Sequence, residues 1–176
     1  MYELINDPFY KLIEQYNRCI IDYCLIKDDN PHQGYKSHKD AIVFAMHKFM
    51  ASYNNLSSED EAIFWNIDED LANGAGIDAA SFFDTSVDKK RLEDGAITYS
   101  YAFFNTPHNT GYGKDDFNKI NEALFPEGRE ALEIYEWSTD WSGYFDDGHE
   151  WWGAGCFSIY DESLDRYVVI MASTTD

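Results

Sequence analysis

The segment from Trp137 to Gly153 holds the residues best suited to binding or chemistry, since it combines four of the five tryptophans with several acids and a histidine. Its glycines are typical of a long ordered loop between strands. The candidate binding residues in it are Asp140, Trp141, Tyr144, Asp146, Asp147, His149, Glu150, Trp151 and Trp152. Rigid aromatic side chains beside carboxylates are typical of a protein interface hot spot that selects a cationic partner. A segment whose aromatic rings stack on sugars would contain the same combination of residues. The alternative is a structural role, in which some rings cover the end of a sheet and the acids are solvated around them.

The motifs of known catalytic and metal sites are missing from the sequence. His149 beside Glu150 could ligate a divalent metal, but the pair lacks the i, i+4 histidines of a zinc-protease helix. The acids over 68–70 and 84–88 lack the glycine and glutamate of a calcium loop. No phosphate-binding glycine loop and no G-x-S-x-G elbow occurs. We therefore predict no cofactor, no metal and no catalytic residue. A small hydrolase that uses Asp146, Asp147, His149 or Glu150 remains the alternative.

The charge of the chain restricts its partners. Among 176 residues, 33 Asp and Glu stand against 13 Lys and Arg, which gives a formal net charge of −20. A nucleic-acid binder must bring cations to the phosphates, so nucleic acid is not an expected partner, and neither is an anionic membrane. Steering toward a basic protein would make use of such a charge. The three cysteines lack CxxC pairs and are expected to be free thiols.

The first half of the chain has the spacing of helices. An aspartate and a proline at 7–8 form an N-cap signal, and apolar residues at helical spacing predict a helix over 8–27. Capping signals and apolar stripes predict a second helix over 37–55 and a third over 57–73.

The second half is dominated by strand signals. Residues 96–104 are β-branched and aromatic with period two, which predicts a strand. A short helix is predicted over 115–125, and 132–137 favours a strand. The runs 156–160 and 166–171 predict a hairpin with a five-residue connection. The expected fold is a single α+β domain over 1–176, with a helical N-terminal half packed on an antiparallel sheet formed mainly by the C-terminal half and ending in a β-hairpin.

The closing pattern of the chain carries a resemblance. The stretch from Asp146 to Gly153, followed by 157–161 and 165–173, resembles the tail of small bacterial proteins. In size, acidity and lack of catalytic motifs the chain resembles, as a class, cytoplasmic immunity proteins that neutralise secreted toxins. This resemblance implies an inhibitor of a basic toxin or nuclease and supplies no site residues. A DNA mimic is a further alternative. The N-terminus lacks a secretory signal, so we expect a cytoplasmic protein.

Overall fold

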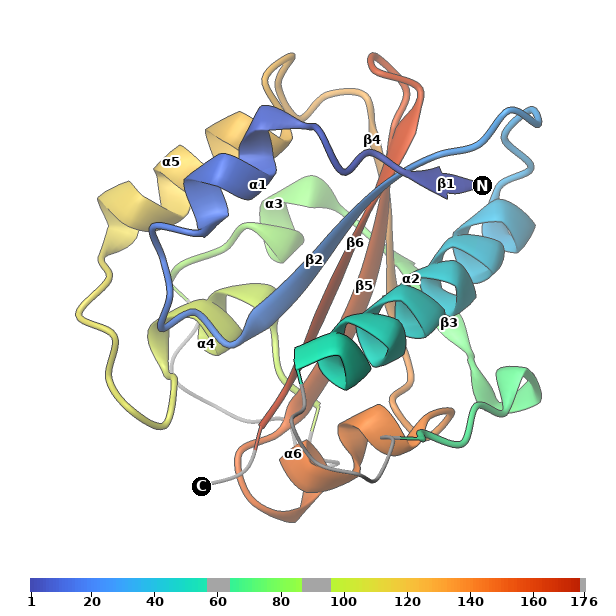
Figure 1. The fold of residues 1–176 in the computed structure, drawn as a ribbon. Coiled ribbons are helices and arrows are strands. Elements are labelled where there is room, and N and C mark those ends of the chain that lie inside the picture. Colours follow the sequence, from blue (N-terminus) through green and yellow to red (C-terminus); the bar gives the residue numbers. More distant parts are fainter. Residues whose placement is uncertain (57–63, 87–95, 175–176) are drawn as a thin grey trace.

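A six-stranded antiparallel sheet organises the chain, and helices cover both of its faces (Figure 1). The computed structural model describes residues 1–56, 64–86 and 96–174. The strand order is β1-β2-β6-β5-β4-β3, so the C-terminal strand lies near the middle of the sheet.

Strands and helices are interspersed along the described part of the chain. The strands are β1 (Tyr2–Glu3), β2 (Ile21–Lys27), β3 (Gly74–Ile77), β4 (Leu132–Trp137), β5 (Ala154–Asp161) and β6 (Arg166–Ser173). The α-helices are α1 (Pro8–Ile13), α2 (Tyr35–Leu56), α3 (Ala79–Phe82), α4 (Tyr99–Phe104), α5 (Lys114–Leu124) and α6 (Asp146–Glu150). The same residues include two 3-10 turns, η1 (Glu69–Leu71) and η2 (Gly143–Phe145).

The central strand β6 is buried on both faces because successive side chains of a strand point in opposite directions. Val168 and Ile170 pack in the core under α1, α3, α4 and α5. Val169 and Met171 pack in a second core under α2 and η2. In Figure 1 the two groups of helices lie on opposite sides of the sheet. The apolar run of β6 therefore joins two cores and makes a three-layer arrangement.

The predicted α+β class and its C-terminal hairpin are confirmed. β5 and β6 pair from Ala154 with Ser173 to Asp161 with Arg166. The helices predicted over 37–55 and 115–125 are α2 and α5, and the favoured strand over 132–137 is β4. Among the described residues, no helix has both the length and the apolar character needed to cross a bilayer.

The single helix predicted over 8–27 is wrong. α1 ends at Ile13, and β2 begins at Ile21 and pairs with β1 on one side and β6 on the other. Most residues of β2 are buried, and a strand buried on both faces needs apolar residues at successive positions and not only at alternate ones. Periodicity alone cannot distinguish such a buried strand from a helix, and the pairing with β6 decided the outcome.

The strand predicted over 96–104 is also wrong, since α4 occupies most of it. Thr98 caps this helix, because its Oγ1 accepts a hydrogen bond from the amide of Tyr101 at 3.1 Å. Tyr99, Ala102 and Phe103 then reach the core at helical spacing. Alternating aromatic residues fit a strand, but i, i+3 and i, i+4 neighbours are also aromatic here, and packing under the sheet selected the helix.

The third helix, predicted over 57–73, is not found where the structure can test it. Its first part, 57–63, lies outside the described residues. In the remainder only η1 is helical, and β3 starts at Gly74. Asp68 caps η1 through its own side chain, which accepts from the amide of Asp70 at 3.2 Å. Local caps of this kind compete with a longer helix.

Candidate functional site

The segment between β4 and β5 separates most of its aromatic rings from its acids. Trp141, Tyr144 and Trp152 are buried, with only 1%, 6% and 6% of their surface exposed. Trp151, in contrast, is 49% exposed. The carboxylates of this segment are all exposed, and they belong to Asp140, Asp146, Asp147 and Glu150.

The buried rings hold the segment against the body of the protein. The Tyr144 hydroxyl donates to Asp22 Oδ2 at 2.7 Å, and burial raises the pKa of that carboxyl group. The indole N–H of Trp152 donates to the carbonyl of Asn105 at 2.6 Å. Trp141 belongs to the core under α2, a cluster that includes Ile42 and Met46. Three of the four candidate rings therefore pack as the structural alternative expects.

His149, near the end of the segment, contacts another residue of the same segment. Its Nε2 lies 2.7 Å from Thr139 Oγ1. It belongs to α6, whose first turn contains Asp146 and Asp147. Among the described residues, no group of three metal-ligating side chains includes His149.

Residues 66–71, an acidic segment distant in the sequence, lie against the segment that follows β4. Ile67 and Ser142 form an antiparallel bridge, and the amide of Asp68 donates to the carbonyl of Trp141 at 2.8 Å. The Ser138 hydroxyl donates to the carbonyl of Leu71 at 2.8 Å. These contacts place η1 and its cap, which carry exposed carboxylates, against the segment that follows β4.

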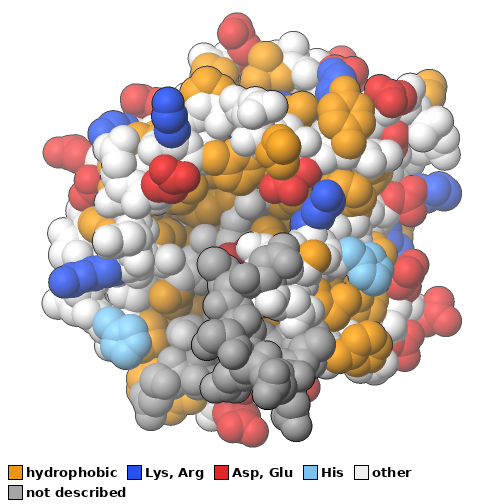
Figure 2. All heavy atoms as spheres, in the orientation of Figure 1, with side chains coloured by type: hydrophobic (Ala, Val, Ile, Leu, Met, Phe, Trp, Pro, Cys, Tyr) orange, Lys and Arg blue, Asp and Glu red, His pale blue; other side chains and the backbone are white. Residues whose placement is uncertain are grey.

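We call this joined region the acidic surface. Its members are the exposed residues Asp68, Glu69, Asp70, Asp140, Asp146 and Asp147. The stretches 49–88 and 130–165, from which all of them come, contain no Lys or Arg in the sequence. Figure 2 shows a group of acidic side chains at the right-hand edge of the molecule, over η1. Exposed Leu71, 47% accessible, lies at the end of η1.

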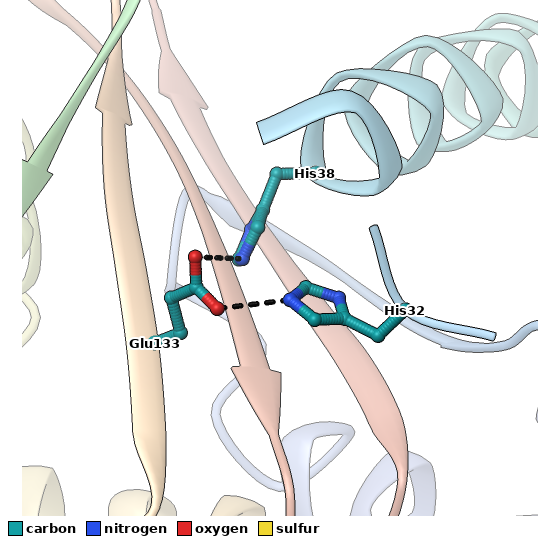
Figure 3. Close-up of side chains that lie close together, drawn as sticks. All are labelled: His32, His38 and Glu133. Atoms are coloured by element: carbon teal, nitrogen blue, oxygen red, sulfur yellow. Dashed lines mark hydrogen bonds and ion pairs between the residues drawn. The ribbon is translucent and has the colours of Figure 1, made fainter. Parts of the chain in front are cut away.

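A second polar region, which the sequence analysis missed, lies between α2 and the sheet. It consists of His32, His38 and Glu133, and we call it the histidine–glutamate cluster. Figure 3 shows both imidazole rings directed at the carboxylate of Glu133, which extends from β4. His32 Nε2 lies 2.9 Å from Glu133 Oε2, and His38 Nε2 lies 3.9 Å from Glu133 Oε1.

His38 is the buried member of this cluster. Its side chain has no exposed surface and lies one turn before Ala41 and Ile42, on the apolar stripe of α2. Its Nδ1 lies 2.8 Å from Ser158 Oγ, which also accepts from the indole N–H of Trp137 at 2.8 Å. Burial lowers the pKa of His38 to about 4, so the ring is neutral at pH 7.

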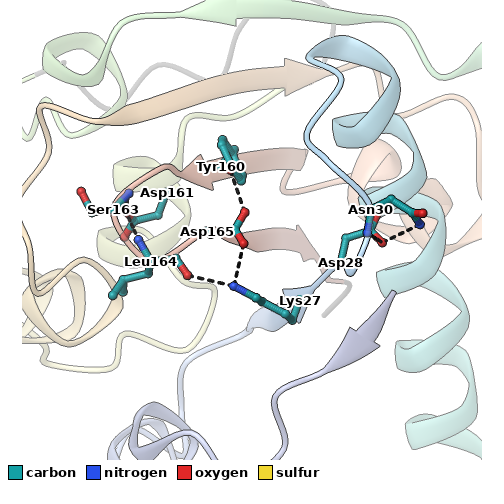
Figure 4. Close-up of polar contacts among 8 residues, drawn as sticks. All are labelled: Lys27, Asp28, Asn30, Tyr160, Asp161, Ser163, Leu164 and Asp165. Carbon is teal, nitrogen blue, oxygen red and sulfur yellow. Dashed lines mark hydrogen bonds and ion pairs between the residues drawn. The ribbon is translucent and has the colours of Figure 1, made fainter.

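His32 is held by aromatic neighbours at the sheet. Its Nδ1 lies 2.7 Å from the Tyr167 hydroxyl, and its ring stacks on Tyr160 with centroids 3.9 Å apart. Tyr160 is fixed in turn, because its hydroxyl donates to Asp165 Oδ1 at 2.8 Å while Lys27 pairs with Oδ2 of the same carboxylate at 2.8 Å (Figure 4).

The loop that carries His32 has its own turn. Asp28 Oδ1 accepts from the amide of Asn30 at 3.1 Å, an Asx turn that redirects the chain from β2 toward α2 (Figure 4).

Beside His32 and Glu133 an open pocket of about 470 Å³ is lined by Glu130, Leu132, Tyr160 and Glu162 among others.

Only part of the cluster could be found from sequence. A histidine on the apolar stripe of α2 is a visible signal for His38. Nothing in the sequence joins Glu133 to it, since the two residues are far apart in the chain and β4 reaches α2 only through the pairing of the sheet.

Comparisons with known proteins identify no family for this chain. No family model matches, and no curated protein matches. Among solved structures, the crystal structure of citrus MAF1 is similar with a TM-score of 0.39 and 14% sequence identity, over 93% of this chain and 99% of that one.

Proposed function

We propose that this chain is an acidic protein-binding module, an immunity-type inhibitor that neutralises a basic toxin or nuclease through the acidic surface. The observation that carries the proposal is the backbone pairing of two segments, 66–71 and 138–147, which between them hold six exposed acids and come from stretches without Lys or Arg. Concentrated charge of one sign costs self-repulsion in the folded state, and steering of a partner of opposite charge is a function that would justify it.

Two exposed apolar side chains, on η1 and after α6, supply the second part of the proposed interface. Leu71 is 47% exposed beside Asp70, and Trp151 is 49% exposed after α6. Interfaces gain affinity from a few such anchors, while charges at the rim act mainly on the association rate. Stacking on sugars, the other use considered for this segment, needs accessible ring faces, and the burial of Trp141, Tyr144 and Trp152 does not favour it.

The test compares two triple variants of equal charge. The surface variant carries Asp70→Asn, Asp140→Asn and Asp147→Asn. The control carries Glu14→Gln, Glu122→Gln and Glu127→Gln, which are also exposed but lie on or next to α1 and α5. Each variant changes the formal net charge from −20 to −17, since three of the acids are neutralised.

Proteins retained by the wild-type chain from a lysate of the source cell would be identified, purified and measured for association rate at several salt concentrations. We expect the surface variant to associate about tenfold more slowly at low salt with a flatter salt dependence, and the control to behave as wild type. Equal rates for both variants would show that binding does not use the acidic surface.

A further inference from the structure

The histidine–glutamate cluster has the donor set of a metal site. His32, His38 and Glu133 each offer a ligand atom, a ring nitrogen or a carboxylate oxygen, and these atoms all lie within 4.8 Å of one another. We propose that these three side chains bind one divalent transition-metal ion, with Zn²⁺ as the best match, and leave a coordination position open toward the adjacent pocket. No sequence motif indicates this site, because its ligands come from a loop, a helix and a strand.

The buried nitrogen of His38 is the first argument. Its Nε2 is fully buried and has no hydrogen-bond partner, and Glu133 Oε1 lies 3.9 Å away. A buried polar atom without a partner has lost its hydrogen bonds to water and gained none in return, which destabilises the folded state. An ion between this nitrogen and the carboxylate would supply the missing interaction.

The outer partners of both rings are the second argument. Ligating histidines commonly hydrogen-bond through their other ring nitrogen, which fixes the ring and its tautomer. Here His38 Nδ1 contacts Ser158 Oγ at 2.8 Å and His32 Nδ1 contacts the Tyr167 hydroxyl at 2.7 Å. Without a metal, His32 Nε2–H donates to the Glu133 carboxylate. A bound ion would take the place of this proton, and with each Nδ1–H donating to its hydroxyl both Nε2 lone pairs would be available to the ion.

The spacing of the donor atoms needs little change. Bonds of about 2.0–2.1 Å in a tetrahedral zinc site place ligand atoms about 3.3 Å apart. His32 Nε2 lies 2.9 Å from Oε2 of Glu133 and His38 Nε2 lies 3.9 Å from Oε1, so each nitrogen has a carboxylate oxygen at a separation close to that value. The Glu133 side chain is 43% exposed, so it can adjust while both rings keep their hydrogen bonds.

The ligand types decide the class of metal. Two imidazoles with one carboxylate suit zinc and similar transition ions, whereas magnesium and calcium prefer all-oxygen sites. Three protein ligands are also one fewer than a closed structural zinc site uses. The pocket of about 470 Å³ that His32 and Glu133 line gives water or another small ligand access to the remaining position.

The experiment uses the full chain after removal of metals with a chelator. Zn²⁺ is titrated by calorimetry in about 150 mM salt, which screens non-specific binding to surface acids, and Co²⁺ is added in parallel to record its visible absorption bands. We expect one equivalent of Zn²⁺ to bind with an affinity that Mg²⁺ does not approach. His32→Gln and Glu133→Gln should each weaken binding at least about 100-fold, because losing a ligand exceeds the 10–100-fold cost of losing an outer partner.

The matched control is His47→Gln, which removes an exposed histidine of α2 outside the cluster and should bind Zn²⁺ as wild type. His32 and Glu133 are partly exposed, so their variants should fold even if a variant of buried His38 does not. Zinc binding that is undiminished in both His32→Gln and Glu133→Gln would overturn the proposal, and so would the absence of stoichiometric binding to wild type. The cluster would then be a hydrogen-bonded group only.

Discussion

The acidic surface and the histidine–glutamate cluster differ in how their polar side chains are solvated. The acidic surface keeps its carboxylates in water, and backbone pairing such as the Ile67–Ser142 bridge only brings two segments together. In the cluster, His38 is buried and its ring is oriented by Ser158, which Trp137 also contacts. Exposed charges tolerate loose positioning because water solvates them, whereas buried polar atoms require partners. The acidic surface is thus suited to long-range attraction of a charged partner. The histidine–glutamate cluster is suited to binding that requires fixed positions of its donor atoms.

The same contrast exists inside the segment from Trp137 to Gly153. Its acids face solvent, while the rings of Trp141 and Trp152 fill space in the two cores. Residues that are neighbours in sequence therefore divide between a surface and a core. Three predictions test how far this division between exposed and buried groups extends.

The largest expected effect is that of Trp141→Ala. Trp141 is 1% exposed, and removing a buried tryptophan typically lowers the free energy of unfolding by about 3–5 kcal/mol. Trp151→Ala, at a half-exposed position in the same segment, should cost about 1 kcal/mol or less. Urea unfolding followed by circular dichroism measures both. Equal losses of unfolding free energy in the two variants would contradict the assignment of Trp141 to the core and of Trp151 to the surface.

A smaller effect is expected from pH in the metal-free protein. The pKa of His38 is lowered by burial to about 4, against about 6.5 in the unfolded chain. The neutral ring therefore contributes stability that is fully present above pH 6.5 and is lost as the pH falls toward 4, by up to about 3 kcal/mol.

Unfolding free energies at pH 7 and pH 4.5, with EDTA present, measure this loss. His38→Gln provides the control, since glutamine does not titrate and should show the smaller change that the other groups cause. A His38 resonance that titrates near pH 6.5 in the folded protein would contradict the prediction.

The smallest of the three effects concerns Ser158. Ser158→Ala leaves Trp137 Nε1 and His38 Nδ1 buried without their partner, and we expect a loss of about 2 kcal/mol. Ser163→Ala, at an exposed position of the β5–β6 turn, should change stability by less than about 0.5 kcal/mol. Thermal unfolding of both variants provides the comparison, and a Ser158 variant as stable as the Ser163 variant would mean that the cluster is not held from the sheet side.

The sequence predicted elements best where local and tertiary signals agree. α2 and α5 have apolar stripes that pack in the cores, and the β5–β6 hairpin has two apolar runs around a turn. β2 and α4 were assigned wrongly because their apolar patterns suit either structure. Their outcome depends on partners far away in sequence, β6 for the strand and the core under the sheet for the helix. Tertiary packing overrides local preference at such places.

The amino-acid sequence by itself determined the excess of acids, the absence of known catalytic motifs and the α+β class, because composition and periodicity are local properties of the chain. Only the tertiary structure decided which rings are buried, that residues 66–71 lie against 138–147, and that Glu133 meets His32 and His38. The physical reason is that a sheet pairs strands by register and not by sequence distance. Glu133 of β4 meets the start of α2 because β5 and β6 lie between β4 and β2 in the sheet.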